Sequence, residues 1–224
     1  MPRINRVDVG GETYHVLNRA NARVQIFDTD TDYQQFESIL EEAAEKFSMR
    51  ILSYCIMPNH WHLVLHPIHD GDLQAFMGWL TNTHTRRWHV AKATIGQGHL
   101  YQGRYKSFLC EQDQHLFTVL RYVERNAKTA NLVQNTELWK WSSVWRREYG
   151  TEEQKKILAS WPTTVPKNYL EVLNTPLTKN EEDAIERSEA KNIPYGSDLW
   201  VDRTITRYGI EQVLRSVGRP KNGG

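Results

Sequence analysis

Two histidines separated by a single residue are the first feature of this 224-residue sequence that could do chemistry. His60 and His62 lie in the run HWHLVLH, which predicts a β-strand over residues 60–66. Side chains two residues apart on a strand leave the same face of the sheet. The two imidazoles could therefore hold a divalent metal ion if a third ligand arrives from elsewhere. Taken alone, the pair is also compatible with a purely structural role.

A tyrosine and an asparagine one helical turn apart are the second feature. A helix is predicted over 114–127, since apolar residues recur there at helical spacing. Tyr122 and Asn126 lie at i and i+4, on the flank of that apolar stripe. Asn126 could supply an oxygen ligand, and Tyr122 a hydroxyl beside the metal. The alternatives are a packing tyrosine and an asparagine that caps the end of the helix.

These four side chains together could cut a phosphodiester bond. A phenol, with a pKa of about 10, is a poor nucleophile unless something favours the phenolate. A divalent cation can polarise the scissile phosphate and offset the charge that develops in the transition state. A phosphotyrosine bond would keep the phosphodiester energy, so the free end of another strand could reverse it without ATP.

Charge distribution is more informative than the net charge of +1. Residues 73–110 contain no Asp or Glu, and the segment is basic and dotted with aromatic residues. Such a stretch suits a phosphate backbone with bases to stack on, although a solvated surface without acid is the alternative. For contacts with DNA, which would position the strand, we nominate Arg19, Arg23, Arg87, Arg104 and Lys106.

Hydrophobic periodicity predicts the elements that must position these residues. Strands are expected at 13–19, 50–57, 60–66 and 106–111, with Pro58 and Asn59 forming the turn of a hairpin. Helices are expected at 32–47, 73–91 and 114–127, the first capped by Asp30 or Thr31. The order β-α-β-β-α-β plus a helix predicts an α+β fold with a split βαβ arrangement on an antiparallel sheet.

The chain is expected to divide near Gly150, into a domain over 1–150 and an appendage over 151–224. Prolines interrupt 151–180, which predicts a linker with short helical pieces. Residues 181–224 predict an acidic helix, a turn at 194–196 and a short helical stretch ending at 218–221. No apolar run approaches the length of a membrane span, and a cytosolic protein with Cys55 and Cys110 as reduced thiols is expected.

The combination of these motifs closely resembles the single-tyrosine HUH transposases, and among them the REP-associated tyrosine transposases. The resemblance lies in MPNHWHLVL at 57–65 followed by YVERN at 122–126. The opening YHVLNRANARVQIF, the segment YQGRYKSF, and the late PYGSD and GRP are similar to the same group, so the resemblance covers essentially the whole chain.

The resemblance implies a ferredoxin-like HUH nuclease domain followed by a small, mostly helical extension. His60 and His62 would be metal ligands, Asn126 the third ligand, and Tyr122 the nucleophile that becomes joined to a 5′ phosphate. The metal would be Mg²⁺ or Mn²⁺, and the two imidazoles make Mn²⁺ at least as plausible. Many relatives carry Gln at the third position, so the shorter Asn126 leaves the geometry there open.

The implied activity is that of a metal-dependent endonuclease and strand transferase acting on single-stranded DNA. Its substrate would carry hairpins of the repeated extragenic palindrome type, with a short adjacent tetranucleotide guiding cleavage. We expect a cytoplasmic, nucleoid-associated protein that acts as a monomer, with a dimer as the alternative.

Three other readings stay open. The same fold supports non-catalytic DNA- or RNA-binding modules, although these spread aromatic residues over the sheet. A domesticated relative could bind its DNA without transposing. A metal phosphodiesterase using water as nucleophile would cut without leaving protein on the DNA.

Overall fold

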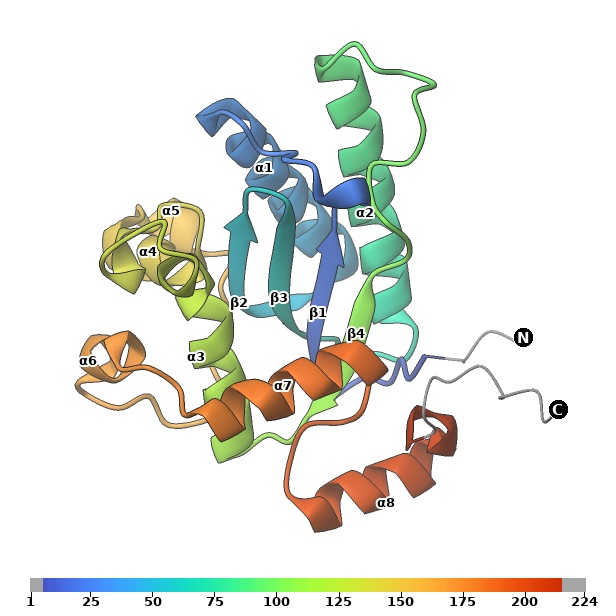
Figure 1. The fold of residues 1–224 in the computed structure, drawn as a ribbon, viewed down its shortest axis with the longest axis vertical. Coiled ribbons are helices and arrows are strands. Elements are labelled where there is room, and N and C mark those ends of the chain that lie inside the picture. The colour runs from blue at the N-terminus through green and yellow to red at the C-terminus, as the bar shows by residue number, and fades with distance from the viewer. Residues whose placement is uncertain (1–5, 215–224) are drawn as a thin grey trace, which may run out of the picture.

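The computed structural model describes residues 6–214 and is built on a four-stranded antiparallel sheet (Figure 1). The strands are β1 (Thr13–Arg19), β2 (Arg50–Met57), β3 (His60–His66) and β4 (Lys106–Cys110). Their order across the sheet is β2-β3-β1-β4, with every pairing antiparallel. The order confirms the predicted α+β split βαβ fold, in which the first and third strands lie side by side at the centre.

Two long helices cover one face of the sheet. Helix α1 (Asp30–Phe47) and helix α2 (Asp72–Ala91) pack on the apolar side chains of β3 and β1, with Trp61 fully buried among them. Helix α1 begins two residues earlier than expected, and its N-cap is Thr29, which forms a capping box with Asp32. The predicted cap at Asp30 or Thr31 is therefore wrong.

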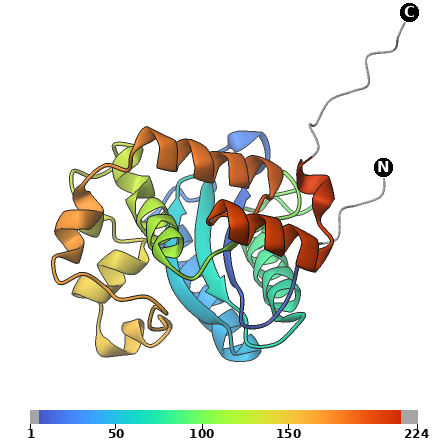
Figure 2. The same ribbon diagram turned by 90° about the horizontal axis from the view of Figure 1, so that it is seen from below.

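The opposite face is covered by α3 (Gln114–Thr129) and α7 (Lys179–Lys191), as Figures 1 and 2 show. The apolar stripe of α3 is fully buried against β2 and β4, as its spacing predicted. A register shift between Ile51 and Ser53 reverses the alternation along β2, so that Ile51 and Tyr54 lie in the same core. Since α3 covers the face that carries the even-numbered residues of β3, it reaches the histidine pair.

The remaining elements are short and follow α3 or connect the strands. They are η1 (Asn21–Arg23), η2 (Thr136–Leu138), α4 (Ser143–Tyr149), α5 (Glu152–Lys155), α6 (Tyr169–Asn174), α8 (Asp198–Tyr208) and η3 (Glu211–Leu214). The expected linker thus holds two short helices, and the expected acidic helix of the tail is α7, which is followed by α8 and η3. The stretch expected to end at 218–221, and with it the GRP motif, lies outside the described residues.

The segment after Gly150 packs on the sheet domain. Ile185 of α7 and Tyr195 share a core with α3, and the backbone of Tyr195 bonds to β4 through Leu109 and Glu111. The division at residue 150 stays a prediction. Both cysteines are buried free thiols, as expected. Within residues 6–214, no helix is long and apolar enough to cross a membrane.

Candidate active site

The histidine pair lies on β3 and faces α3. In the ladder with β1, His60 lies opposite Arg19 and His62 opposite Leu17. The two imidazole rings have their centroids 5.1 Å apart and stand nearly perpendicular. His62 is buried, with 2% of its surface exposed, whereas His60 is half-buried at the end of the strand. The alternation of the strand thus brings both rings to one place, as the sequence predicted.

Each of these histidines uses its Nδ1 atom in a contact within the protein. Nδ1 of His60 lies 2.6 Å from Oδ1 of Asn59, and Nδ1 of His62 lies 2.9 Å from Nε2 of His15. Within residues 6–214, neither Nε2 atom takes part in a hydrogen bond. An imidazole held through one nitrogen can present the lone pair of the other, which is how metal-binding histidines are usually oriented.

Burial keeps these imidazoles neutral. It lowers the pKa of His60 to about 4, with a further contribution from the charge of Arg19. The pKa of His62 is also lowered, first by burial and then by its neighbours His15 and His60. Metal ions bind the neutral form of imidazole, so the pair is available to a cation at neutral pH without first losing protons.

Tyr122 of α3 stands over the same pair. Its ring centroid lies 6.0 Å from that of His62, with the two rings edge-on at 82°. Tyr122 lies beside the apolar stripe of α3, and its side chain is half-buried against the core between α3 and the sheet. Burial raises the pKa of the phenol, and the neighbouring carboxylate of Glu189 raises it further. The free protein therefore holds a protonated phenol beside two neutral imidazoles.

Asn126 follows one turn later on α3. Its Nδ2 donates to the backbone carbonyl of Tyr122 at 3.1 Å. The cap of the helix is Ala130, so Asn126 is not the helix cap. Since its amide nitrogen is turned onto the helix, the acceptor oxygen Oδ1 is the atom left for an outside partner, and no described residue bonds to it. This donor set, two imidazole nitrogens and an amide oxygen, fits a divalent cation such as Mn²⁺.

Sequence reasoning missed two residues of this site. His15 of β1 stacks on His62 with ring centroids 5.1 Å apart, and burial lowers its pKa to about 3. Glu189 of α7 places its carboxylate beside both rings, and burial raises its pKa to about 7. The alternation of β1 could have placed His15 on the face of α3. No local signal marked Glu189, because its proximity depends on how α7 packs.

A cavity of about 350 Å³ opens beside this cluster, and three of the nominated cations line it. Arg19, Arg104 and Lys106 surround it, with Glu189 at one side. The other two nominated cations lie elsewhere. Arg23 is exposed in the turn after β1, and Arg87 forms a two-pronged ion pair with Glu42 at 2.7 and 2.8 Å.

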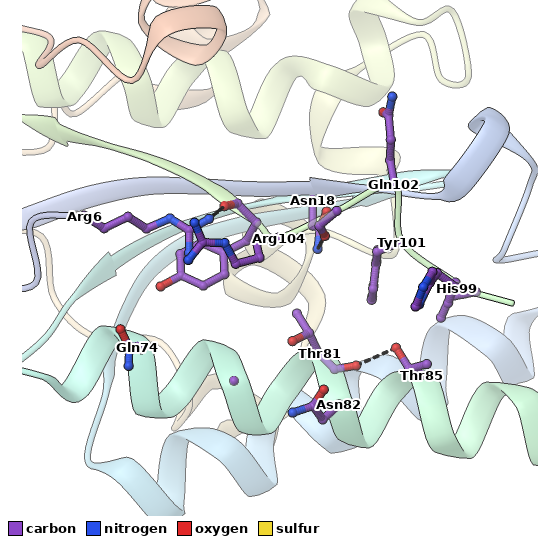
Figure 3. A pocket seen from close by; sticks show the side chains of 14 residues that line it. Arg6, Asn18, Gln74, Thr81, Asn82, Thr85, His99, Tyr101, Gln102 and Arg104 are labelled. Atoms are coloured by element: carbon purple, nitrogen blue, oxygen red, sulfur yellow. Dashed lines mark hydrogen bonds between the residues drawn. The ribbon is translucent and has the colours of Figure 1, made fainter. Parts of the chain in front are cut away.

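A larger cavity of about 710 Å³ lies on the other side of the segment that precedes β4 (Figure 3). Its walls carry amide and basic side chains from α2, β1 and the segment around Arg104, while Gln102 points away from α2. The two cavities share four of their lining residues, namely Asn18, Gln102, Gly103 and Arg104. The two hollows are therefore neighbours around one edge of the sheet.

Known proteins resemble this chain in sequence and in fold. Residues 9–126 match the protein family described as "Transposase IS200 like". Over 125 residues the chain is 24% identical to a Haemophilus influenzae protein named "Putative REP-associated tyrosine transposase", covering 52% of this chain and 71% of that protein. A solved structure of a REP-associated tyrosine transposase bound to a REP hairpin matches with a TM-score of 0.55 at 16% identity, over 71% of this chain and 92% of that one. At this identity, the structural match shows a shared fold.

Proposed function

Since the chain belongs to the IS200-like transposase family, we propose that it cuts and rejoins single-stranded DNA through a covalent bond to Tyr122. The observation that carries this proposal is the position of the Tyr122 ring, 6.0 Å from His62 on the face that also carries His60. The proposed nucleophile and two of the proposed metal ligands lie close together within one chain, which supports action as a monomer.

A divalent cation, Mg²⁺ or Mn²⁺, would be held by His60, His62 and Asn126. When bound, it would polarise the scissile phosphate and offset the negative charge of the transition state. The protein's own part is to keep both imidazoles neutral and to hold the phenol of Tyr122 at the site. Burial keeps both imidazoles neutral by lowering their pKa, and the packing of α3 on the sheet holds Tyr122 beside them.

In the proposed step, the phenolic oxygen of Tyr122 attacks the phosphorus atom and a new oxygen–phosphorus bond forms. The bond from phosphorus to the 3′ oxygen breaks, the phenol proton is released, and the departing 3′ oxygen takes up a proton. The product is a 5′-phosphotyrosine and a free 3′ hydroxyl. Attack by the 3′ hydroxyl of another strand reverses the step and restores the phenol, so strands can be exchanged.

The substrate we propose is a single strand carrying a hairpin of the repeated extragenic palindrome type. Arg19, Arg104 and Lys106 supply positive charge around the cavity that Glu189 also lines, where a phosphate backbone would run. The larger neighbouring cavity offers amide side chains, including the exposed Gln74 and Asn82, that can bond to base edges. Arg23 and Arg87 line neither of these cavities, and Arg87 is paired with Glu42, so the proposed path does not include them.

The deciding experiment is a search for protein covalently attached to DNA. Incubating the protein with a hairpin-bearing single strand and Mn²⁺ should give an adduct that survives SDS. Tyr122→Phe should abolish the adduct and still bind the strand. Tyr33→Phe serves as the matched control, because Tyr33 is a buried tyrosine on the other side of the sheet and lines neither of the two cavities. Cleavage without any adduct would favour water as the nucleophile, and an adduct in Tyr122→Phe would reject this tyrosine.

A further inference from the structure

A carboxylate from α7 faces the two stacked imidazoles of the sheet. Oε1 of Glu189 lies 3.7 Å from Nδ1 of His62 and 3.8 Å from Nδ1 of His15. The Glu189 side chain is only 16% exposed, and the two histidines are essentially inaccessible. Among the described residues, Oε1 of Glu189 and Nδ1 of His15 are buried polar atoms without a hydrogen-bond partner. Such atoms are rare in folded proteins and call for an explanation.

The hydrogen bond between the imidazoles must run in one direction if His62 is to bind a metal. A neutral imidazole has one N–H group and one free lone pair. His62 must carry its proton on Nδ1 to present the lone pair of Nε2. His15 must then accept this proton's hydrogen bond at Nε2, 2.9 Å away, and carry its own proton on Nδ1. That Nδ1 is the unpartnered atom facing Glu189.

A negative charge at Glu189 selects this direction. Its Oε1 is nearly equidistant from both Nδ1 atoms, so it favours a proton on each of them. The separations are longer than a direct hydrogen bond, and a small rotation of the Glu189 side chain would close either one. His60 has a similar support, because its Nδ1 contacts the side chain of Asn59. Both proposed ligands would then present Nε2.

We propose that Glu189 and His15 are positioning residues that hold His62 in the tautomer with its proton on Nδ1, so that Nε2 is presented to the metal. The inference rests on the proposed function, since it takes His62 as a ligand. It also gives the C-terminal extension a part in the site, because Glu189 lies beyond residues 9–126 that match the family. Supports of this kind tune metal affinity through the ligand they orient.

The tautomer can be measured directly in the metal-free, full-length protein. With ¹⁵N-labelled histidine at pH 8, long-range ¹H–¹⁵N spectra of the wild type should show His62 protonated at Nδ1. Glu189→Ala should shift His62 toward the other tautomer and weaken Mn²⁺ binding, measured by calorimetry, by about 10- to 100-fold. Glu189→Gln, which keeps the side-chain volume and removes the charge, should change the tautomer of His62 and the Mn²⁺ affinity in the same direction as Glu189→Ala. Asp183→Ala, at an exposed residue of α7 that pairs with Lys179, should change neither the tautomer of His62 nor the Mn²⁺ affinity.

Substitutions at His15 test the second of the two proposed positioning residues. His15→Leu removes the acceptor for Nδ1–H of His62 and should reproduce the loss of Mn²⁺ affinity. His15→Gln restores a carbonyl acceptor and should recover part of that affinity, which a merely space-filling role of His15 would not predict. Equal affinities in the two variants would overturn the role of His15.

Two results at Glu189 would overturn the proposal. One is weaker Mn²⁺ binding in Glu189→Ala with the tautomer of His62 unchanged, which would make Glu189 a direct ligand. The other is no change in either measurement. Failure of the proposed function would look different. A wild-type protein that shows the expected tautomer and Mn²⁺ affinity but forms no DNA adduct would reject the nuclease activity. It would leave the positioning role of Glu189 and His15 intact.

Discussion

Tyr122 and His62 meet edge-on, with ring centroids 6.0 Å apart, although they come from a helix and a strand on separate parts of the chain. The contact exists because α3 lays its apolar stripe on the sheet and so turns its flank toward β3. The proposed nucleophile on a helix and the proposed ligands on a strand are thereby held by two rigid elements. Rigid placement of this kind is what a covalent step on a phosphate needs.

His60→Ala should weaken Mn²⁺ binding by at least about tenfold and abolish DNA cleavage, because it removes one of three proposed ligands. Thermal stability should change little, since His60 is half-buried at the end of β3. Calorimetry with Mn²⁺ and a thermal melt measure the two effects. The matched control is His66→Ala, on the same strand face, whose Nδ1 contacts Oγ1 of Thr13. Wild-type Mn²⁺ affinity in His60→Ala would remove the metal assignment.

Asn126 tests whether the third ligand comes from α3. Asn126→Asp adds a charged oxygen at the same reach and should strengthen Mn²⁺ binding, whereas Asn126→Leu should weaken it. Both variants keep the helix, since Asn126 is not its cap. Comparing the two dissociation constants by calorimetry decides the matter. Identical constants in both variants would exclude Asn126 from the coordination shell.

Salt dependence of DNA binding should separate the nominated cations. Arg104→Ala and Lys106→Ala should each reduce the slope of log affinity against log salt by roughly 0.7, the value for one phosphate contact on a single strand. Arg87→Ala should leave the slope nearly unchanged, because its guanidinium is paired with Glu42. Fluorescence anisotropy with a labelled hairpin strand at several salt concentrations gives the slopes. A large loss of slope in Arg87→Ala would move the DNA path onto α1 and α2.

Stability should fall as the pH drops below about 6.5. His15 and His84 have their pKa lowered to about 3 and His60 to about 4, so between these values and 6.5 the unfolded chain binds more protons. Glu189, with its pKa raised to about 7, acts in the opposite sense and offsets only one imidazole. From pH 6.5 to 5 the free energy of unfolding should fall by on the order of 2–4 kcal/mol.

Urea titrations at each pH provide the measurement. His84 lies far from the proposed metal site, in the core beneath α1 and α2, where its Nδ1 contacts the hydroxyl of Tyr101. His84→Gln should therefore make the decline with acid shallower and leave Mn²⁺ binding unchanged. Constant stability between pH 7 and 5 would contradict the buried, neutral state of these imidazoles.

The sequence was enough to predict the main elements and to nominate the candidate site residues. Alternation along 60–66 was enough to put His60 and His62 on one face, and helical spacing over 114–127 was enough to put Tyr122 beside the apolar stripe. Such periodicities are local properties of the backbone, so they can be predicted without knowing the partner elements. The order of strands and helices then indicated the sheet topology.

Only the tertiary structure decided which of these residues contact one another. The antiparallel register of β1 with β3 brings His15 onto His62, and the packing of α7 on the sheet brings Glu189 to both. Those contacts depend on strand order, register and the docking of a distant helix, which no local pattern specifies. The same reason explains Arg87, whose basic surroundings in the sequence gave no sign that α1 would neutralise it through Glu42.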